Sequence, residues 1–484
     1  MDFIFKRIKS AKMGFTYGLA VVLVIFQGII IQCDANPTNQ TQYAPTIDIK
    51  NNQLSFPDDL IEVIFSKTDF KTIQNGIKAG IFSAPDPVMS RKLQNWIIFI
   101  RLDSFDGKIH EYYEDGNLFV KFGNYAGLMS FFNKFGDQVR KIKYWYSSTI
   151  SDARRNEISQ TIIKRCAKNL EELRIEIDGD EKFWQEISNE ENDIIFPNVK
   201  KFQFKGRSIQ NKLKLNLIFP KLEFLELMGS VADVNCLANV KSLTELTLRT
   251  SSIDEDQFEN IFKNNKNMTK VSLLLPQRTA TIHSIAEYLT KLKTLEVEFP
   301  GENFLVRANN DPVYELPSVT QFNIIFLEMD EVFGIGNLSF DMPNLKELTM
   351  GGVISDGRFI NFIGKFKKLE MVKVFVTNYD TLKCIEKLQN IKEFTTTFYR
   401  NGFDSLKNMF EQFDEKSKLQ TLKFINLDSY YYCRNYAKAM TEINEDTMKE
   451  INFNLKELGK PTWTLSSEID IGTGKEYLMF KRDP

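Results

Sequence analysis

Side chains that could carry out catalysis are few and widely separated in this sequence. The 484 residues contain two histidines, His110 and His283, which lie far apart. The Gly-Ile-Gly run at 334–336 and the Gly-Thr-Gly run at 472–474 lack the third glycine of a dinucleotide-binding turn. The sequence has no P-loop, no Gly-x-Ser-x-Gly and no His-Glu-x-x-His. It therefore predicts a protein that is not an enzyme and that holds no metal and no cofactor.

Cysteine chemistry is also sparse. Apart from Cys33, the cysteines are Cys166, Cys236, Cys384 and Cys433, which are widely spaced and form no Cys-x-x-Cys pair, so a zinc site is not predicted. Four cysteines allow three disulfide pairings, among which Cys384 with Cys433 is the most compatible with a long fold. The alternative, which we favour, is that all four are small buried hydrophobic residues.

Composition indicates a globular protein, and three sequons mark candidate modification sites. Hydrophobic residues make up 43% of the chain and charged residues 26%, and a net charge of −2 gives no indication of a nucleic-acid or membrane-surface partner. Three Asn-x-Ser/Thr sequons, at Asn39, Asn267 and Asn337, are candidate glycosylation sites.

The elements that would position any site are repeats. The run Leu222-Glu-Phe-Leu225-Glu-Leu227 returns in similar form at 170, 243, 292, 345 and 369, and weaker copies begin at 139, 199, 268, 319, 391 and 419. The last two leucines of each copy share one face of a short strand, which cannot bury that face alone. Stacked copies bury it together, so the pattern predicts a solenoid.

These copies in one register resemble the leucine-rich repeat family, from about residue 139 to 424. The resemblance implies an α/β solenoid with a curved parallel sheet on the concave side, helices on the convex side and a protein ligand. The consensus Asn or Cys after each strand is missing, because residues such as Ser230, Ser251 and Pro300 stand there. The repeats are therefore similar to the irregular type found in F-box proteins, and no cysteine-rich caps are present.

Apolar spacing predicts the remaining elements. Helices are expected at 125–135, 152–170, 254–266, 283–292, 357–366, 379–388, 404–418 and 432–458. Asp115-Gly116 between alternating runs predicts a hairpin within 108–122. A second hairpin, from 463–465 to 477–480, would close the end of the solenoid.

The N-terminus has the layout of a secretory signal peptide. Basic residues at 6–12 precede an apolar run at 15–31, and small residues lie at 33 and 35. The alternative is an uncleaved signal anchor, and otherwise no membrane span is expected. The expected segments are a signal peptide at 1–35, a polar linker at 36–55, an N-terminal capping region at 56–138, repeats at 139–430 and a C-terminal cap at 431–484. We expect the protein in the secretory pathway or outside the cell.

One short stretch points to another compartment. The run at 56–65, Phe-Pro-Asp-Asp-Leu-Ile-Glu-Val-Ile-Phe, resembles the opening helix of an F-box. An F-box joined to irregular leucine-rich repeats implies a cytosolic substrate adaptor of a ubiquitin ligase. A capping helix is the alternative for this stretch. No methionine lies between Met13 and Met89, so a cytosolic form that keeps this helix would need a different first exon.

Alternation along the strands predicts a binding surface on the concave side. We expect a protein-binding groove that contains apolar residues at outward positions: Phe224, Met228, Leu274, Ile325, Met371 and Phe375. Polar residues at the other outward positions would set specificity: Glu172, Arg174, Gln203, Glu226, Glu245, Thr247, Ser272, Glu296, Asn323 and Lys373. The alternative is that the strand ends bend and turn some of these apolar residues into the core.

Overall fold

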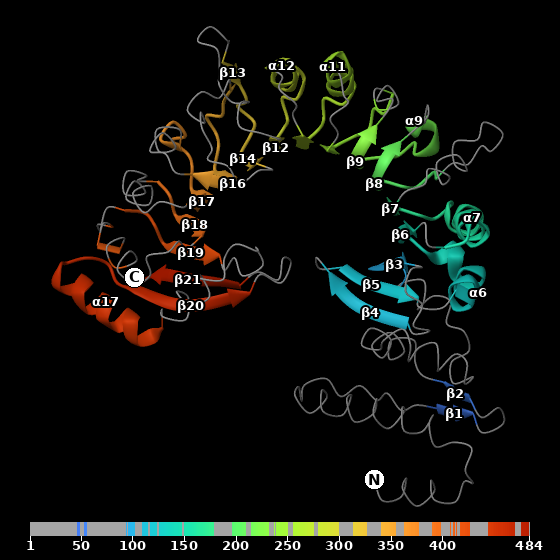
Figure 1. Cartoon of the computed structure of the whole chain (residues 1–484), viewed down its shortest axis with the longest axis horizontal. Coiled ribbons are helices and arrows are strands. Elements are labelled where there is room, and N and C mark those ends of the chain that lie inside the picture. The colour runs from blue at the N-terminus through green and yellow to red at the C-terminus, as the bar shows by residue number, and fades with distance from the viewer. Residues whose placement is uncertain are drawn as a thin grey trace, which may run out of the picture. The chain divides into compact units, whose positions relative to one another are not determined.

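The chain divides into two units, Met1–Ile142 and Lys143–Pro484 (Figure 1). The computed structural model describes residues 46–48, 53–55, 93, 95–101, 109–114, 117–122, 125–147, 150–178, 196–209, 214–231, 237, 239–249, 255–274, 279–299, 313–326, 340–354, 363–376, 390–397, 407, 410–411, 413, 417–425, 444–469 and 476–483. The segment 1–35 and the F-box-like stretch 56–65 lie outside these residues. Within the described part, no helix is long and apolar enough to cross a membrane.

Among its described residues, the first unit contains a separate pair of strands, three further strands and helix α6. Strands β1 (Thr46–Asp48) and β2 (Gln53–Ser55) pair in antiparallel fashion. Strands β4 (Ile109–Glu114) and β5 (Asn117–Phe122) form the predicted hairpin, and β5 also pairs in parallel with β3 (Trp96–Arg101). Helix α6 (Tyr125–Phe135) matches its predicted bounds and is followed by a 3-10 turn, Gly136–Gln138. Strand β6 (Lys141–Ser147) crosses the boundary between the units.

The second unit is built on one long sheet of parallel strands. Each strand pairs with the next at the same motif position, so that Leu246 of β10 lies between Leu225 of β9 and Val271 of β11. The strands are β7 (Glu172–Asp178), β8 (Lys201–Ile209), β9 (Phe224–Val231), β10 (Glu245–Arg249), β11 (Lys270–Leu274), β12 (Thr294–Phe299), β14 (Gln321–Phe326), β16 (Glu347–Ile354), β17 (Met371–Val376), β18 (Glu393–Thr397) and β19 (Thr421–Ile425). Two short strands, β13 (Tyr314–Glu315) and β15 (Phe340–Asp341), pair separately.

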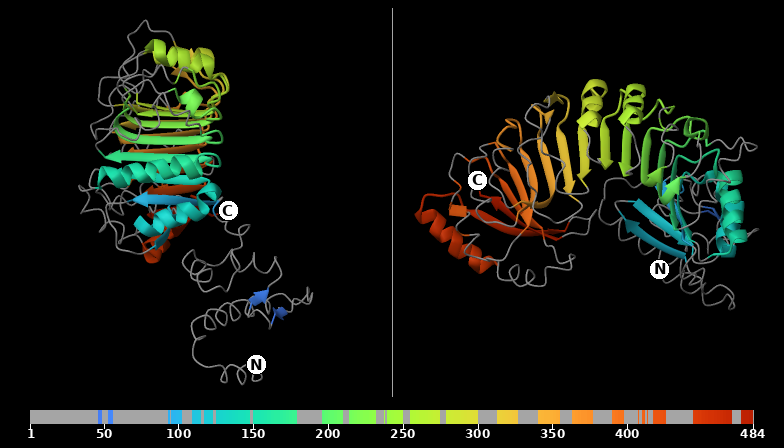
Figure 2. Two further views of the ribbon diagram at one scale, coloured as in Figure 1. Left: turned by 90° about the vertical axis from the view of Figure 1, so that its right-hand side faces the viewer. Right: turned by 45° about the horizontal axis from the view of Figure 1, so that its top comes forward.

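Helices connect the strands on the other side of the core. Figures 1 and 2 show α11 (Glu255–Asn264) and α12 (Thr279–Tyr288) on the outer side of the strands. Helix α7 (Asp152–Thr161) continues as a π-helical turn, Ile162–Cys166, and α9 (Leu215–Ile218) is short. Helix α12 begins and ends four residues earlier than the helix expected at 283–292. Those expected at 357–366, 379–388 and 404–418 fall largely outside the described residues.

The core contains the motif leucines, as predicted. Leu225, Leu246 and Leu295 are each 0% exposed and Leu348 is 1% exposed. Burying a leucine side chain stabilises a fold by about 1.5–3 kcal/mol.

A polar residue that the sequence did not single out also lies in this core. Asn265 is buried, donates from Nδ2 to the carbonyls of Val240 (2.6 Å) and Ile261 (2.9 Å), and accepts from the Leu243 amide (3.0 Å).

An antiparallel hairpin ends the sheet. Strand β21 (Glu476–Arg482) pairs in antiparallel fashion with β19 and with β20 (Trp463–Ile469), as expected for the closing hairpin. Helix α17 (Glu445–Glu457) places Met448, Ile451 and Leu455 in the core. Asn452 on α17 binds both backbone groups of Trp463, donating to its carbonyl (2.8 Å) and accepting from its amide (2.9 Å).

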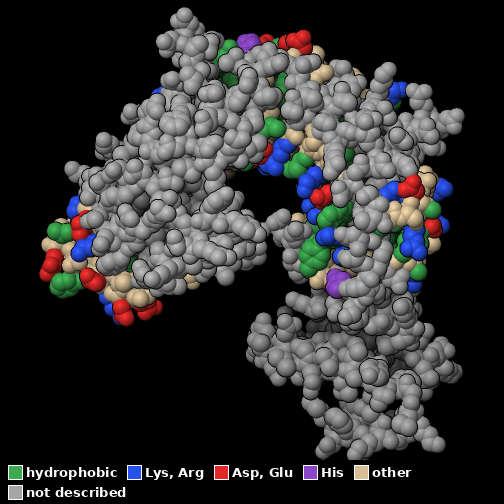
Figure 3. Space-filling view, in the orientation of Figure 1, with side chains coloured by type: hydrophobic (Ala, Val, Ile, Leu, Met, Phe, Trp, Pro, Cys, Tyr) green, Lys and Arg blue, Asp and Glu red, His purple; other side chains and the backbone are tan. Residues whose placement is uncertain are grey.

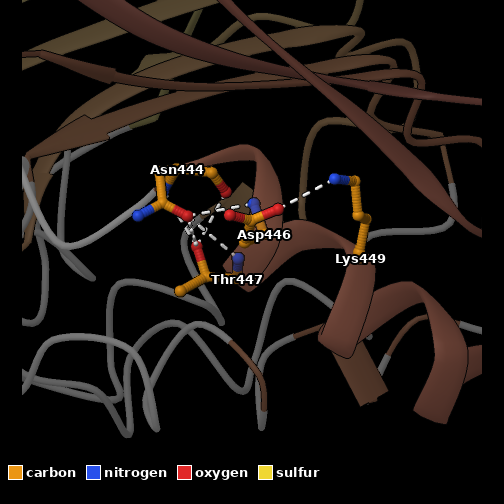
Figure 4. A network of polar contacts seen from close by, with 4 residues as sticks. All are labelled: Asn444, Asp446, Thr447 and Lys449. Carbon is orange, nitrogen blue, oxygen red and sulfur yellow. Dashed lines mark hydrogen bonds and ion pairs between the residues drawn. The ribbon is translucent and has the colours of Figure 1, made fainter.

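The first turn of α17 has a complete capping box (Figure 4). The Asn444 side chain accepts from the amides of Asp446 and Thr447, and the Thr447 hydroxyl accepts from the Asn444 amide. This arrangement pairs backbone donors that a helix start otherwise leaves unpaired. The hydrogen bond from Lys449 to Asp446 (2.8 Å) lowers the pKa of that exposed carboxyl.

The parallel register at a recurring spacing, the leucine core and the outer helices define the architecture. The second unit is a mixed α/β leucine-rich repeat solenoid, as the sequence predicts.

Candidate functional site

The face of the sheet that points away from the helices, called the open face below, carries every second strand residue. In β10 the buried residues Leu246 and Leu248 alternate with half-buried Glu245, Thr247 and Arg249. The same alternation runs through β11, β12 and β14, although Ser272 and Glu298 on the open face are themselves buried. Open-face residues of successive strands form rows across the sheet, because the strands share one register.

One row, called the distal row, is formed by the third open-face residue of strands β9, β10, β11, β12 and β14. Met228 of β9 pairs with Arg249 of β10. Glu298 of β12 pairs with both Leu274 of β11 and Ile325 of β14. Apolar and charged side chains therefore alternate along this row. In Figure 3, hydrophobic, basic and acidic side chains lie next to one another along the inner margin of the strands.

The structure brings three of the six predicted groove residues together. Met228, Leu274 and Ile325 occupy the distal row and are half-buried. Their preceding neighbours Leu227, Leu273 and Ile324 are each 0% exposed, so the strands do not bend these three residues into the core.

The other predicted groove residues lie elsewhere. Phe224 and Met371 stand in the first open-face row, on strands β9 and β17, with β10, β11, β12, β14 and β16 between them. Phe224 lies beneath the Lys201 ammonium, 4.7 Å from the ring centre, and Met371 is 39% exposed. The side chain of Phe375 lies outside the described part of the structure. The six residues therefore do not line a single apolar stripe.

A polar cluster lies between the apolar residues of the distal row. Nη2 of Arg249 is 2.5 Å from Oε1 of Glu298 and 3.6 Å from Oε1 of Glu296. Glu296 also accepts from the Ser272 hydroxyl (2.7 Å) and from Nδ2 of Asn323 (3.3 Å). The Glu298 side chain is 6% exposed. Its burial raises the pKa of the carboxyl, Arg249 lowers it and Glu296 raises it.

Two further open-face carboxylates are held by neutral amides. Gln203 donates to Glu226 (2.5 Å), and Gln321 donates to Glu347 (2.6 Å). At the start of the sheet the partners are basic instead. Glu172 pairs with Arg174 (2.5 Å) and Lys201 (3.7 Å), and Lys205 pairs with Glu176 (2.9 Å). Of the other predicted polar residues, Glu245, Thr247 and Lys373 are half-buried on the same face.

A ladder of polar residues, which the sequence interpretation missed, precedes the strands. It uses the residue just before each motif's first apolar position. Asn198, Asn344 and Asn390 donate to carbonyls of the preceding repeat, at 2.9, 2.7 and 3.0 Å. Lysines of the following repeat donate to Asn198, Asn267, Asn344 and Asn390. The signal was a recurrence of Asn or Lys at this position, outside the leucine pattern.

The remaining candidate sites are isolated. Asn267 is exposed, and its Oδ1 accepts from Lys291 (2.7 Å); Asn39 and Asn337 lie outside the described residues. Cys166 is buried, and the other four cysteines lie outside the described residues. His283 lies 3.3 Å from Glu287 on α12 and His110 is exposed on β4. No group of His, Cys, Asp and Glu residues in the described part could hold a metal ion.

Comparison with known proteins gives limited similarity. No known family model matches the chain, and no curated protein matches it. Solved structures that match include an internalin of Listeria monocytogenes, with 14% identity, a TM-score of 0.27 and coverage of 55% of this chain and 83% of the internalin. Internalin C2 of the same bacterium matches with 14% identity, a TM-score of 0.22, and coverage of 42% and 73%. The assignment of the fold rests on the parallel register of the repeats.

Proposed function

We propose that this chain is a leucine-rich repeat protein of the secretory pathway that binds a protein partner on its open face. The observation that carries the proposal is the distal row, in which Met228, Leu274 and Ile325 remain partly exposed beside an ordered polar cluster. Protein-binding patches typically combine apolar anchors with hydrogen-bonded polar groups. The basic and apolar N-terminal segment supports export, and the absence of catalytic motifs supports a binding role rather than an enzymatic one.

Capture of a partner from the tissue of origin tests the binding role. The triple variant M228S/L274S/I325S should lose the partner that the wild-type chain retains. A matched control, L217S/V313S/L458S, replaces three exposed apolar residues outside the open face and should retain it. The melting temperatures of both variants should stay close to that of the wild type. Equal retention by both variants would remove the open face as the binding site.

Expression in insect cells tests the compartment. If residues 1–35 act as a signal peptide, protein should accumulate in the medium and begin at Asn36. N-terminal sequencing decides this point. An unprocessed cytosolic chain bound to the core of a ubiquitin ligase would instead favour the F-box adaptor function, which the stretch 56–65 suggests.

A further inference from the structure

Charge is distributed unevenly over the open face. In the central strands β9, β10, β11, β12, β14 and β16, the open-face positions carry five carboxylates, Glu226, Glu245, Glu296, Glu298 and Glu347, against two basic side chains, Arg249 and Lys270. At the start of the sheet, on β7 and β8, the balance is reversed, because Arg174, Lys201 and Lys205 accompany Glu172 and Glu176. The centre of the face is therefore acidic beside a weakly basic end.

Three of the central carboxylates accept hydrogen bonds from neutral side chains. Glu226 and Glu347 accept from the side-chain amides of Gln203 and Gln321, and Glu296 accepts from Ser272 and Asn323. A neutral donor stabilises the ionised carboxylate without cancelling its negative charge. These hydrogen bonds order the carboxylates and leave them available to a cation.

Glu296 and Glu298 share one guanidinium. Arg249 contacts both carboxylates, so the cluster has one positive charge for two negative charges. The Glu298 side chain is 6% exposed, so water does not solvate its charge. A second cation nearby would stabilise such a buried carboxylate. The shortage of positive charge lies beside Glu296, which is 18% exposed and can be reached from solvent.

Apolar side chains flank the same point. Leu274 and Ile325 are the register partners of Glu298 on its two sides, and both are half-buried. Arginine combines an aliphatic stem with a planar charged head, so it suits carboxylates set between aliphatic residues.

We propose that the partner presents an arginine side chain to Glu296 and Glu298, with its stem against Leu274 and Ile325. This inference rests on the proposed function, because it specifies the chemistry of the partner bound on the open face. The alternative is a partner with an acidic segment that pairs with Arg249 in place of Glu296 and Glu298. The test below distinguishes the two.

The test uses the full secreted chain and fluorescent peptides in which leucine alternates with arginine, glutamine or glutamate. Fluorescence anisotropy at low salt should show that the arginine peptide binds about tenfold more tightly than the glutamine peptide, with the preference declining as salt increases. Glu296→Gln, which keeps an oxygen acceptor for Ser272, should remove most of the preference. Glu223→Gln is the matched control, because Glu223 is 49% exposed and pairs with Lys200 just before β9.

Each other result overturns the proposal. Equal binding of the arginine and glutamine peptides, a preference for the glutamate peptide, or no binding of any peptide would do so. The same peptides separate this inference from the proposed function. A captured partner that is lost in M228S/L274S/I325S, but retained by Glu296→Gln at unchanged affinity and salt dependence, would leave open-face binding intact and exclude the arginine.

Discussion

The guanidinium of Arg249 on β10 reaches past Leu274 on β11 and lies 2.5 Å from the carboxylate of Glu298 on β12. The ion pair therefore spans two strand spacings, about 9.5 Å, rather than joining neighbours. It links three repeats on the open face and fixes the position of the carboxylate that faces Ile325.

Glu298→Gln is expected to be at least as stable as the wild type at pH 7. Burial raises the pKa of the Glu298 carboxyl above its ordinary value of 4.5. Because the folded pKa is the higher one, ionisation destabilises the fold above that pKa, and the loss disappears as the pH falls through it. The urea midpoints of the wild type and of Glu298→Gln should differ most at pH 7 and converge below about pH 4.5. A variant that is less stable by the same amount at both pH values would contradict this expectation.

Leu246→Ala is expected to cost about 2–5 kcal/mol of unfolding free energy, because it opens a cavity in the core. Thr247→Ala, one residue further along β10 and on the open face, should cost less than about 1 kcal/mol. Chemical denaturation of the two variants compares neighbouring positions in one strand. Equal losses would show that the strand register is wrong.

Asn265→Ala is expected to cost about 1–3 kcal/mol, because the buried Leu243 amide and the Val240 carbonyl would lose their partner. Asn198→Ala is the control, since Asn198 belongs to the exposed ladder where water replaces the lost hydrogen bonds. Thermal unfolding should separate the two variants clearly. Similar melting temperatures would mean that the buried asparagine contributes no more than the exposed one.

Asn444→Ala is expected to destabilise the C-terminal cap by about 1 kcal/mol, because two amides of the first turn of α17 lose their acceptor. Hydrogen exchange should increase first in α17. Binding on the open face should not change, and a loss of binding without a loss of α17 protection would contradict a purely local role.

The sequence predicts those features that local patterns encode. The spacing of Leu225 and Leu227 predicts the strand, its buried face and, through repetition, the parallel stacking. The same alternation correctly places Met228, Leu274 and Ile325 on the open face.

Features that depend on neighbouring repeats were not predicted. Arg249 and Glu298 are 49 positions apart in sequence, and their contact depends on side-chain reach across Leu274. Phe224 and Met371 are likewise far apart because several strands lie between β9 and β17. The predicted groove included both residues only because both are apolar and occupy outward positions. Asn265 was not predicted as a core residue because a single asparagine directly after helix α11 carries no periodic signal.

The antiparallel direction of β21 limits where repeats can be added to or lost from the solenoid. Its antiparallel pairing with β19 closes the ladder at that end with a strand that does not continue the repeat register. A duplicated repeat can enter the series between β7 and β19 and find the same neighbours on both sides, because the units interact with adjacent units alone. Evolution can thus lengthen or shorten the array internally while the terminal hairpin is inherited unchanged.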